Sequence, residues 1–193
     1  MVCALLFIMP LLMLFVIMKA KRKSIFGWGN VFANYHFGDF MQDAWLPLTV
    51  ASILLIVAQV NDVNLFEQLE NVLDIGIAII PSMVALIVAA YTIMFSFILG
   101  EKVSEIKEKD GGKEFIQSIN SSFAMCLLVS IVTIIVIVFV KCICSMDLGV
   151  EPTLANVINS AAYFLACFLL TYSVFILIGI VIDIYNSGQT SLL

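Results

Sequence analysis

The chain has 193 residues, of which 63% are hydrophobic and only 12% are charged, and its formal net charge is −5. A soluble domain of this size carries about twice that share of charged residues, so the composition excludes an ordinary soluble protein. Together with a mean hydropathy of +1.14, this predicts an all-α integral membrane bundle that forms a single transmembrane domain over residues 1–193.

The first apolar run covers residues 1–18, contains no formal charge and is just long enough to cross a membrane. Four basic residues follow it directly. Because a cleaved signal peptide carries its positive charge before the apolar core, this reversed order favours a first span with its N-terminus outside. The chain then has five spans, or four if this run does not span.

Residues 24–45 are crowded with aromatic residues and glycines and follow a basic run, a combination typical of the lipid headgroup region. We therefore predict an interfacial segment within a cytoplasmic loop at 19–43. The residues expected to contact headgroups are Lys19, Lys21, Arg22, Lys23 and Trp28.

A second span is predicted at 44–60, with Pro47 in its first turn. The next segment, 61–74, carries four acidic residues and no basic residue, while its apolar side chains recur at helical spacing. We expect a short amphipathic helix at the membrane surface there, followed by a third span at 75–99.

The third span carries a row of small and weakly polar residues separated by four, three, four, three, four and four positions. Such spacing produces one narrow seam on a helix, with the near-heptad period of left-handed packing. Lipid does not require a seam of small residues, whereas a closely packed helix does. The seam consists of Ala78, Ser82, Ala85, Ala89, Thr92, Ser96 and Gly100.

Charged residues dominate the segment 100–122, which leads to a fourth span at 123–140. Helical spacing on both sides of an Asp-Gly-Gly break predicts an αα-hairpin that protrudes about two turns beyond the membrane. This hairpin is either a docking surface for a partner or merely a solvated helix end. The candidate docking residues are Glu105, Lys107, Lys109, Asp110 and Lys113.

A second stripe of small residues runs along the fourth helix, and a fifth span at 154–182 also has a small or polar face. The stripe consists of Ser118, Ser122, Cys126, Ser130 and Thr133. With the N-terminus outside, every Lys and Arg except Lys141 falls on the inner side, so the positive-inside rule places the hairpin and the C-terminus in the cytoplasm.

Motifs of membrane enzymes are absent from the sequence, which has one histidine and an odd number of cysteines without a CxxC pair. We expect no enzyme activity, no cofactor, no metal and no direct contact with nucleic acid. Because no charged residue falls inside the predicted spans, coupled transport is also disfavoured. A pore lined by Ser82, Thr92 and Ser96 of an oligomer is an alternative, as is a small transporter subunit.

The run 80–140 contains Tyr91-Thr92-Ile93, then Gly100-Glu101-Lys102 and the charged turn. In these residues and in its layout the chain resembles the KwaA-type membrane proteins of the bacterial Kiwa anti-phage defence system, although that family has four spans. The resemblance implies a homo-oligomer, such as a tetramer, in the inner membrane. It also implies a sensor of phage attachment that works with a soluble, KwaB-like cytoplasmic partner. We therefore expect a scaffold and sensor that oligomerises through the seam.

Overall fold

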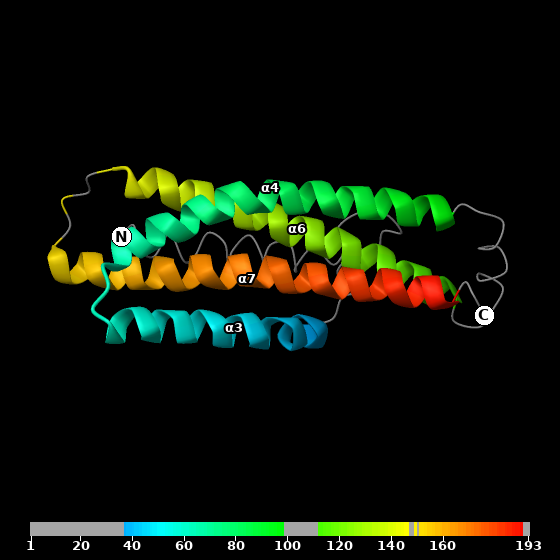
Figure 1. The fold of residues 1–193 in the computed structure, drawn as a ribbon, viewed down its shortest axis with the longest axis horizontal. Helices are drawn as coiled ribbons and strands as arrows, with labels where there is room; N and C mark the ends of the chain where they lie inside the picture. The colour runs from blue at the N-terminus through cyan, green and yellow to red at the C-terminus, as the bar shows by residue number, and fades with distance from the viewer. Residues whose placement is uncertain (1–36, 99–111, 147–148, 150, 191–193) are drawn as a thin grey trace.

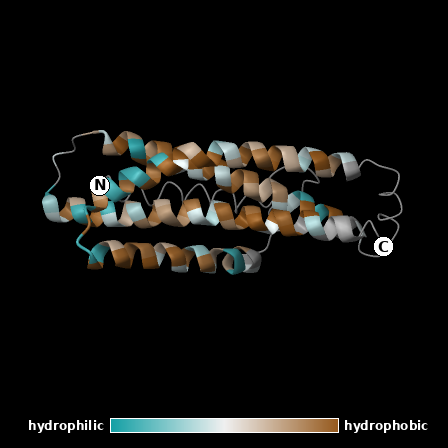
Figure 2. Ribbon diagram, in the orientation of Figure 1, coloured by the Kyte–Doolittle hydropathy of each residue, from teal (hydrophilic) through white to brown (hydrophobic). Residues whose placement is uncertain are grey.

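A computed structural model describes residues 37–98, 112–146, 149 and 151–190. This part of the chain forms four helices and no strand: α3 (Phe37–Val60), α4 (Leu65–Ile98), α6 (Gly112–Cys144) and α7 (Pro152–Thr190). All four are long and apolar enough to cross a membrane, and Figure 2 shows their apolar character along most of their length. The protein is therefore a multi-pass, all-helical membrane protein. The predicted first span at 1–18, the basic run, Trp28 and most of the hairpin lie outside the described residues.

The four helices lie side by side, and each runs antiparallel to the one before it (Figure 1). Helices α4, α6 and α7 all pack against one another, whereas α3 packs chiefly on α7. In Figure 1, the N-terminal end of α3 stops well short of the ends that α4, α6 and α7 reach on the same side. The molecule is thus a three-helix bundle with a shorter helix attached to one side.

The structure corrects several element boundaries. The expected surface helix within 61–74 and the third span are one continuous helix, α4, because its buried leucines keep their helical spacing into the apolar run. The backbone N–H of Phe66 donates to Asn64 Oδ1 at 3.1 Å, which caps the start of this helix. Gly112 does not end a helix but is the first residue of α6.

The other helices are also longer than the spans expected from the sequence. The end of the aromatic segment is helical, since α3 begins at Phe37 rather than near residue 44. The helical segment expected after the Asp-Gly-Gly break and the fourth span form one continuous helix, α6. Helix α7 runs from Pro152 to Thr190. At about 1.5 Å per residue, α4, α6 and α7 all exceed a hydrocarbon layer of about 30 Å.

Small residues allow the helices to approach closely. A Cβ atom on Gly76 of α4 would collide with the side chain of Ile137 on α6, and Ile137 itself is fully buried. Helix α3 packs on α7 through another row of small or compact residues. The buried members of this row are Ala44, Pro47, Ala51 and Ala58. Lipid gives no hydrophobic force between helices, so this close van der Waals contact carries much of the packing.

Hydroxyl groups inside the bundle are hydrogen-bonded. Thr133 of α6 and Ser173 of α7 are both fully buried, and their Oγ atoms lie 3.0 Å apart. Ser130 donates to the carbonyl oxygen of Cys126 at 2.9 Å, within its own helix. Among the described residues, no buried side-chain nitrogen or oxygen is left without a partner. Polar groups inside a bilayer need hydrogen-bond partners within the protein, and the described part of the bundle supplies them.

Candidate oligomerisation face on helix α4

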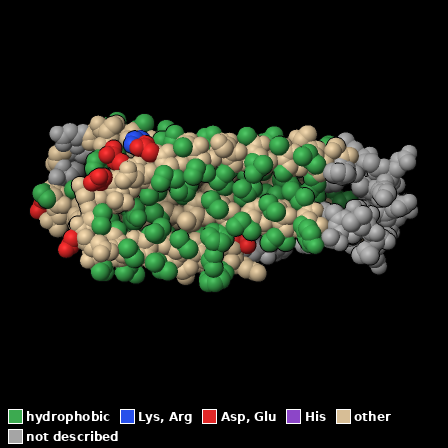
Figure 3. All heavy atoms as spheres, viewed as in Figure 1, with side chains coloured by type: hydrophobic (Ala, Val, Ile, Leu, Met, Phe, Trp, Pro, Cys, Tyr) green, Lys and Arg blue, Asp and Glu red, His purple; other side chains and the backbone are tan. Residues whose placement is uncertain are grey.

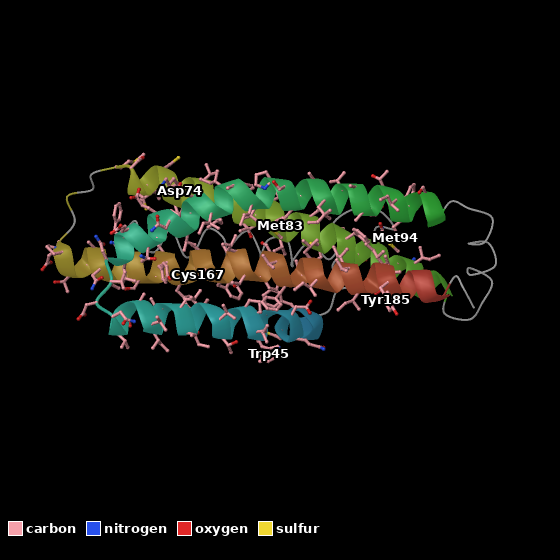
Figure 4. The ribbon with its side chains drawn as sticks, in the orientation of Figure 1. Trp45, Asp74, Met83, Met94, Cys167 and Tyr185 are labelled. Atoms are coloured by element: carbon pink, nitrogen blue, oxygen red, sulfur yellow. The ribbon has the colours of Figure 1, made fainter. Side chains whose placement is uncertain are left out.

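The face of α4 that packs inside the bundle is defined by its buried residues. These recur every three or four positions as far as Ile87, and Met94 follows seven positions later, on the side of α4 that packs against α6 and α7. Figure 4 shows Met83 and Met94 on the side of α4 that faces the other helices. The buried row consists of Leu65, Leu69, Leu73, Gly76, Ile80, Met83, Ile87 and Met94.

The predicted seam lies on the opposite side of the same helix. With a rotation of about 100° per residue, the seam residues fall about 180° from the buried row. The described seam residues are all exposed: Ala78, Ser82, Ala85, Ala89, Thr92 and Ser96. Gly100 lies outside the described residues. The structure therefore directs the seam away from the rest of the subunit.

Large apolar side chains border the seam on both sides. Ile75, Ile79, Leu86 and Ile93 form one edge on a helical projection, and all are exposed. The other edge consists of the exposed residues Ile77, Val88 and Phe95. The seam is thus a shallow furrow of small residues between two ridges, a shape that accepts the side chains of another helix.

The outward faces of the other helices are built differently. Their exposed side chains are mostly large and apolar, as lipid contact favours. Examples are Trp45, Ile53 and Ile56 on α3, Ile131, Ile135 and Phe139 on α6, and Val157, Ile178 and Val181 on α7. Within the described part of the chain, a continuous outward row of small residues occurs on α4 alone. This contrast marks α4 as the candidate protein-contacting face.

Polar atoms on the α4 face are compatible with an apolar environment. Thr92 Oγ1 donates to the carbonyl oxygen of Val88 at 2.8 Å, and Ser96 Oγ donates to that of Ile93 at 2.6 Å. Each hydroxyl thus satisfies its donor within its own helix. The face can therefore contact lipid or another helix without leaving these donors unpaired.

The second stripe of small residues, on α6, has a different destination. Cys126, Ser130 and Thr133 are buried, Ser122 is half-buried and Ser118 is exposed. From Cys126 onward this stripe packs within the subunit. The two stripes looked equivalent in the sequence, yet one holds the bundle together and the other faces outward.

Polar contacts join α4 to α6 near both ends of the pair. The Lys141 Nζ atom lies 2.9 Å from Asp74 Oδ1 and 3.6 Å from Glu70 Oε1. At the other end, the Tyr91 hydroxyl donates to Asn120 Oδ1 at 2.8 Å. The Tyr91 ring also packs on Phe123, with centroids 5.4 Å apart.

These contacts are about one membrane thickness apart. Residues 74 and 91 are separated by about 26 Å along α4, and residues 120 and 141 by about 32 Å along α6, at about 1.5 Å per residue. A hydrocarbon layer is about 30 Å thick. The two contacts thus bracket a length of α4 and α6 close to the thickness of that layer. The Lys141 level is the acidic end, where Figure 3 shows carboxylates gathered; they belong to Asp62, Glu67, Glu70, Asp74 and Glu151.

The predicted docking residues are largely outside the described part of the chain, namely Glu105, Lys107, Lys109 and Asp110. Lys113 lies in the first turn of α6. The described residues contain no group of three or more His, Cys, Asp or Glu side chains that could hold a metal ion.

Comparison with known proteins gives no match to a family model, to a curated protein or to a solved structure.

The different positions of the two stripes can be tested by matched substitutions. Ser130 is 0% exposed, so Ser130→Leu should overpack the bundle and cost about 1–3 kcal/mol of stability. Ser82 is exposed, so Ser82→Leu should leave the stability of the isolated subunit nearly unchanged. Thermal unfolding in a detergent that keeps the protein monomeric would measure both. Equal losses of stability would show that both stripes are internal.

Proposed function

We propose that this protein is a non-enzymatic scaffold and sensor of a bacterial membrane, which assembles with copies of itself through the outward face of α4. The observation that carries the proposal is that the whole described seam lies opposite the buried face of its helix. In this proposal the second role of the protein is to recruit a soluble cytoplasmic partner, at the end where α4 leaves the membrane and α6 enters it.

A second copy fits the α4 face better than lipid does. All copies of a membrane protein share one orientation, so two α4 helices meet in parallel around an axis normal to the membrane. The same small residues then face each other, and the near-heptad spacing favours a left-handed crossing of about 20°. Ala85 and Ala89 lie at the centre of the described seam, which makes them the expected point of closest approach.

The recruitment role depends on the distribution of charge. Lys102, Lys107 and Lys109 belong to the connection from α4 to α6, and Lys113 lies in the first turn of α6, at the end marked by Tyr91 and Asn120. Within the described part of the chain, the basic residue at the acidic end is Lys141. The positive-inside rule therefore favours a cytoplasmic position for the connection and for the C-terminus, and an outer position for the acidic end.

The anti-phage role is the most specific part of the proposal and comes from the resemblance to KwaA-type proteins. By analogy with that family, the oligomer in the inner membrane senses phage attachment and passes the signal to a KwaB-like cytoplasmic partner. The acidic end is the part of the described chain that would face the outside, where attachment takes place.

A pore is the second candidate, and the outward hydroxyls of Thr92 and Ser96 favour it. In a ring of copies, these side chains would line the central axis instead of lying between two helices. Conductance of purified protein in a planar bilayer distinguishes the two arrangements, because a closely packed scaffold does not conduct.

The oligomer contact can be tested by enlarging the seam. Ala89→Leu and Ser96→Leu should each weaken self-association in bilayers at least tenfold, because the added atoms prevent close approach of the two helices. Förster transfer between labelled subunits in vesicles measures the strength of self-association. The control is Gly179→Leu on the exposed face of α7, where an added side chain meets open space, and it should have no effect. Unchanged association of the Ala89 variant would contradict the contact.

The recruitment role can be tested by reversing charge in the connection. The double variant Lys107→Glu, Lys109→Glu should no longer co-purify the product of the adjacent gene, because a docking contact there depends on positive charge. Glu67→Lys with Glu151→Lys reverses two charges at the acidic end and should retain the partner. Co-purification that survives the lysine reversals would contradict docking at this segment.

A further inference from the structure

One hydroxyl group on the outward face of α4 differs from the others. Thr92 and Ser96 donate to carbonyl oxygens of their own helix, at 2.8 and 2.6 Å. Ser82 is exposed on the same face, and its hydroxyl has no hydrogen-bond partner within the described part of the chain. It lies in the run 75–98, which contains no charged residue. Since the apolar layer supplies no water, this hydroxyl lacks the partner that an exposed serine finds on a soluble protein.

The residue before Ser82 frees a backbone acceptor on the same helix. Pro81 lies inside α4 and has no N–H, so the carbonyl oxygen of Ile77, four residues earlier, lacks its usual donor in the helix. Ile77 and Pro81 are both exposed, whereas Met83 faces the other helices (Figure 4). The free carbonyl therefore opens toward the outside of the subunit, where an unpaired acceptor is costly in lipid.

This donor and this acceptor lie on opposite sides of the seam. At about 100° per residue, Ser82 is turned about 40° from the mean direction of the seam, toward the edge that contains Ile79 and Leu86. Pro81 is turned about 60° the other way, toward the edge that contains Ile77. The Ile77 carbonyl points along the helix axis toward Pro81, so its oxygen lies less than one helical turn from the level of Ser82.

A two-fold axis makes this arrangement self-complementary. In two parallel copies related by such an axis, one side of the seam faces the opposite side of the seam of the other copy. Each Ser82 hydroxyl then approaches the Ile77 carbonyl of the other copy, and the contact contains this hydrogen bond twice. Lipid chains offer neither a donor nor an acceptor, so a second copy satisfies both groups where lipid satisfies neither.

We propose that Ser82 fixes the register of the α4 contact, by donating a hydrogen bond to the Ile77 carbonyl oxygen that Pro81 leaves free in the second copy. This inference rests on the proposed oligomer contact and adds to it the polar bond that holds the two helices at one level. Small residues allow two helices to approach in more than one register, whereas a polar pair within the contact favours a single one.

Three single variants that all keep the seam small test the bond. Ser82→Ala removes the donor, and Pro81→Ala restores the N–H that occupies the Ile77 carbonyl. Ser96→Ala is the control, because it deletes a hydroxyl of the same seam that is already bonded within its own helix. Self-association is measured by Förster transfer between labelled subunits in vesicles, and helix content by circular dichroism verifies that each variant is folded.

Ser82→Ala and Pro81→Ala should each weaken self-association about five- to tenfold, because a hydrogen bond between membrane helices contributes modestly and the contact contains it twice. The variant with both changes should be no weaker than either single variant, since both remove the same bond. Ser96→Ala should stay within about twofold of the parent. Equal association of Ser82→Ala and Ser96→Ala would overturn the proposal, as would losses that add in the double variant.

Failure of the oligomer contact itself gives a different result. In that case the parent does not associate, or Ala89→Leu associates as well as the parent, and the contact and the bond are both refuted. A parent that associates, an Ala89→Leu variant that does not, and an unchanged Ser82→Ala variant would refute the hydrogen bond alone.

Discussion

The antiparallel pairing of α4 with α6 is the constraint on which the rest of the structure depends. It is fixed near one end by Lys141 between Asp74 and Glu70, and near the other by Tyr91 and Asn120. Between these contacts the helices are apolar, and lipid supplies no force that drives such surfaces together. The polar contacts therefore set the register, while the close approach at Gly76 supplies van der Waals contact.

A functional feature follows from this pairing. Because α4 directs its large buried residues toward α6 and α7, its small residues face outward, and the seam becomes available to a second copy.

The sequence was sufficient for the membrane class and for four of the expected spans, because these depend on local hydropathy and helical spacing. It could not show which stripe faces outward, since Ser82 and Ser130 occur in similar patterns and only tertiary packing separates them. The alanine row of α3 was overlooked, although its seven-residue spacing is visible in the sequence.

The central claim is that the outward face of α4 meets the same face of a second copy. Disulfide cross-linking in native membranes, with single cysteines in an otherwise cysteine-free protein, tests it most directly. Ala85→Cys should form covalent dimers rapidly on oxidation, because this residue lies at the expected point of closest approach. Ile131→Cys, on the exposed lipid-facing side of α6, should not. Cross-linking that is equal at the two positions, or absent at residue 85, would contradict the account.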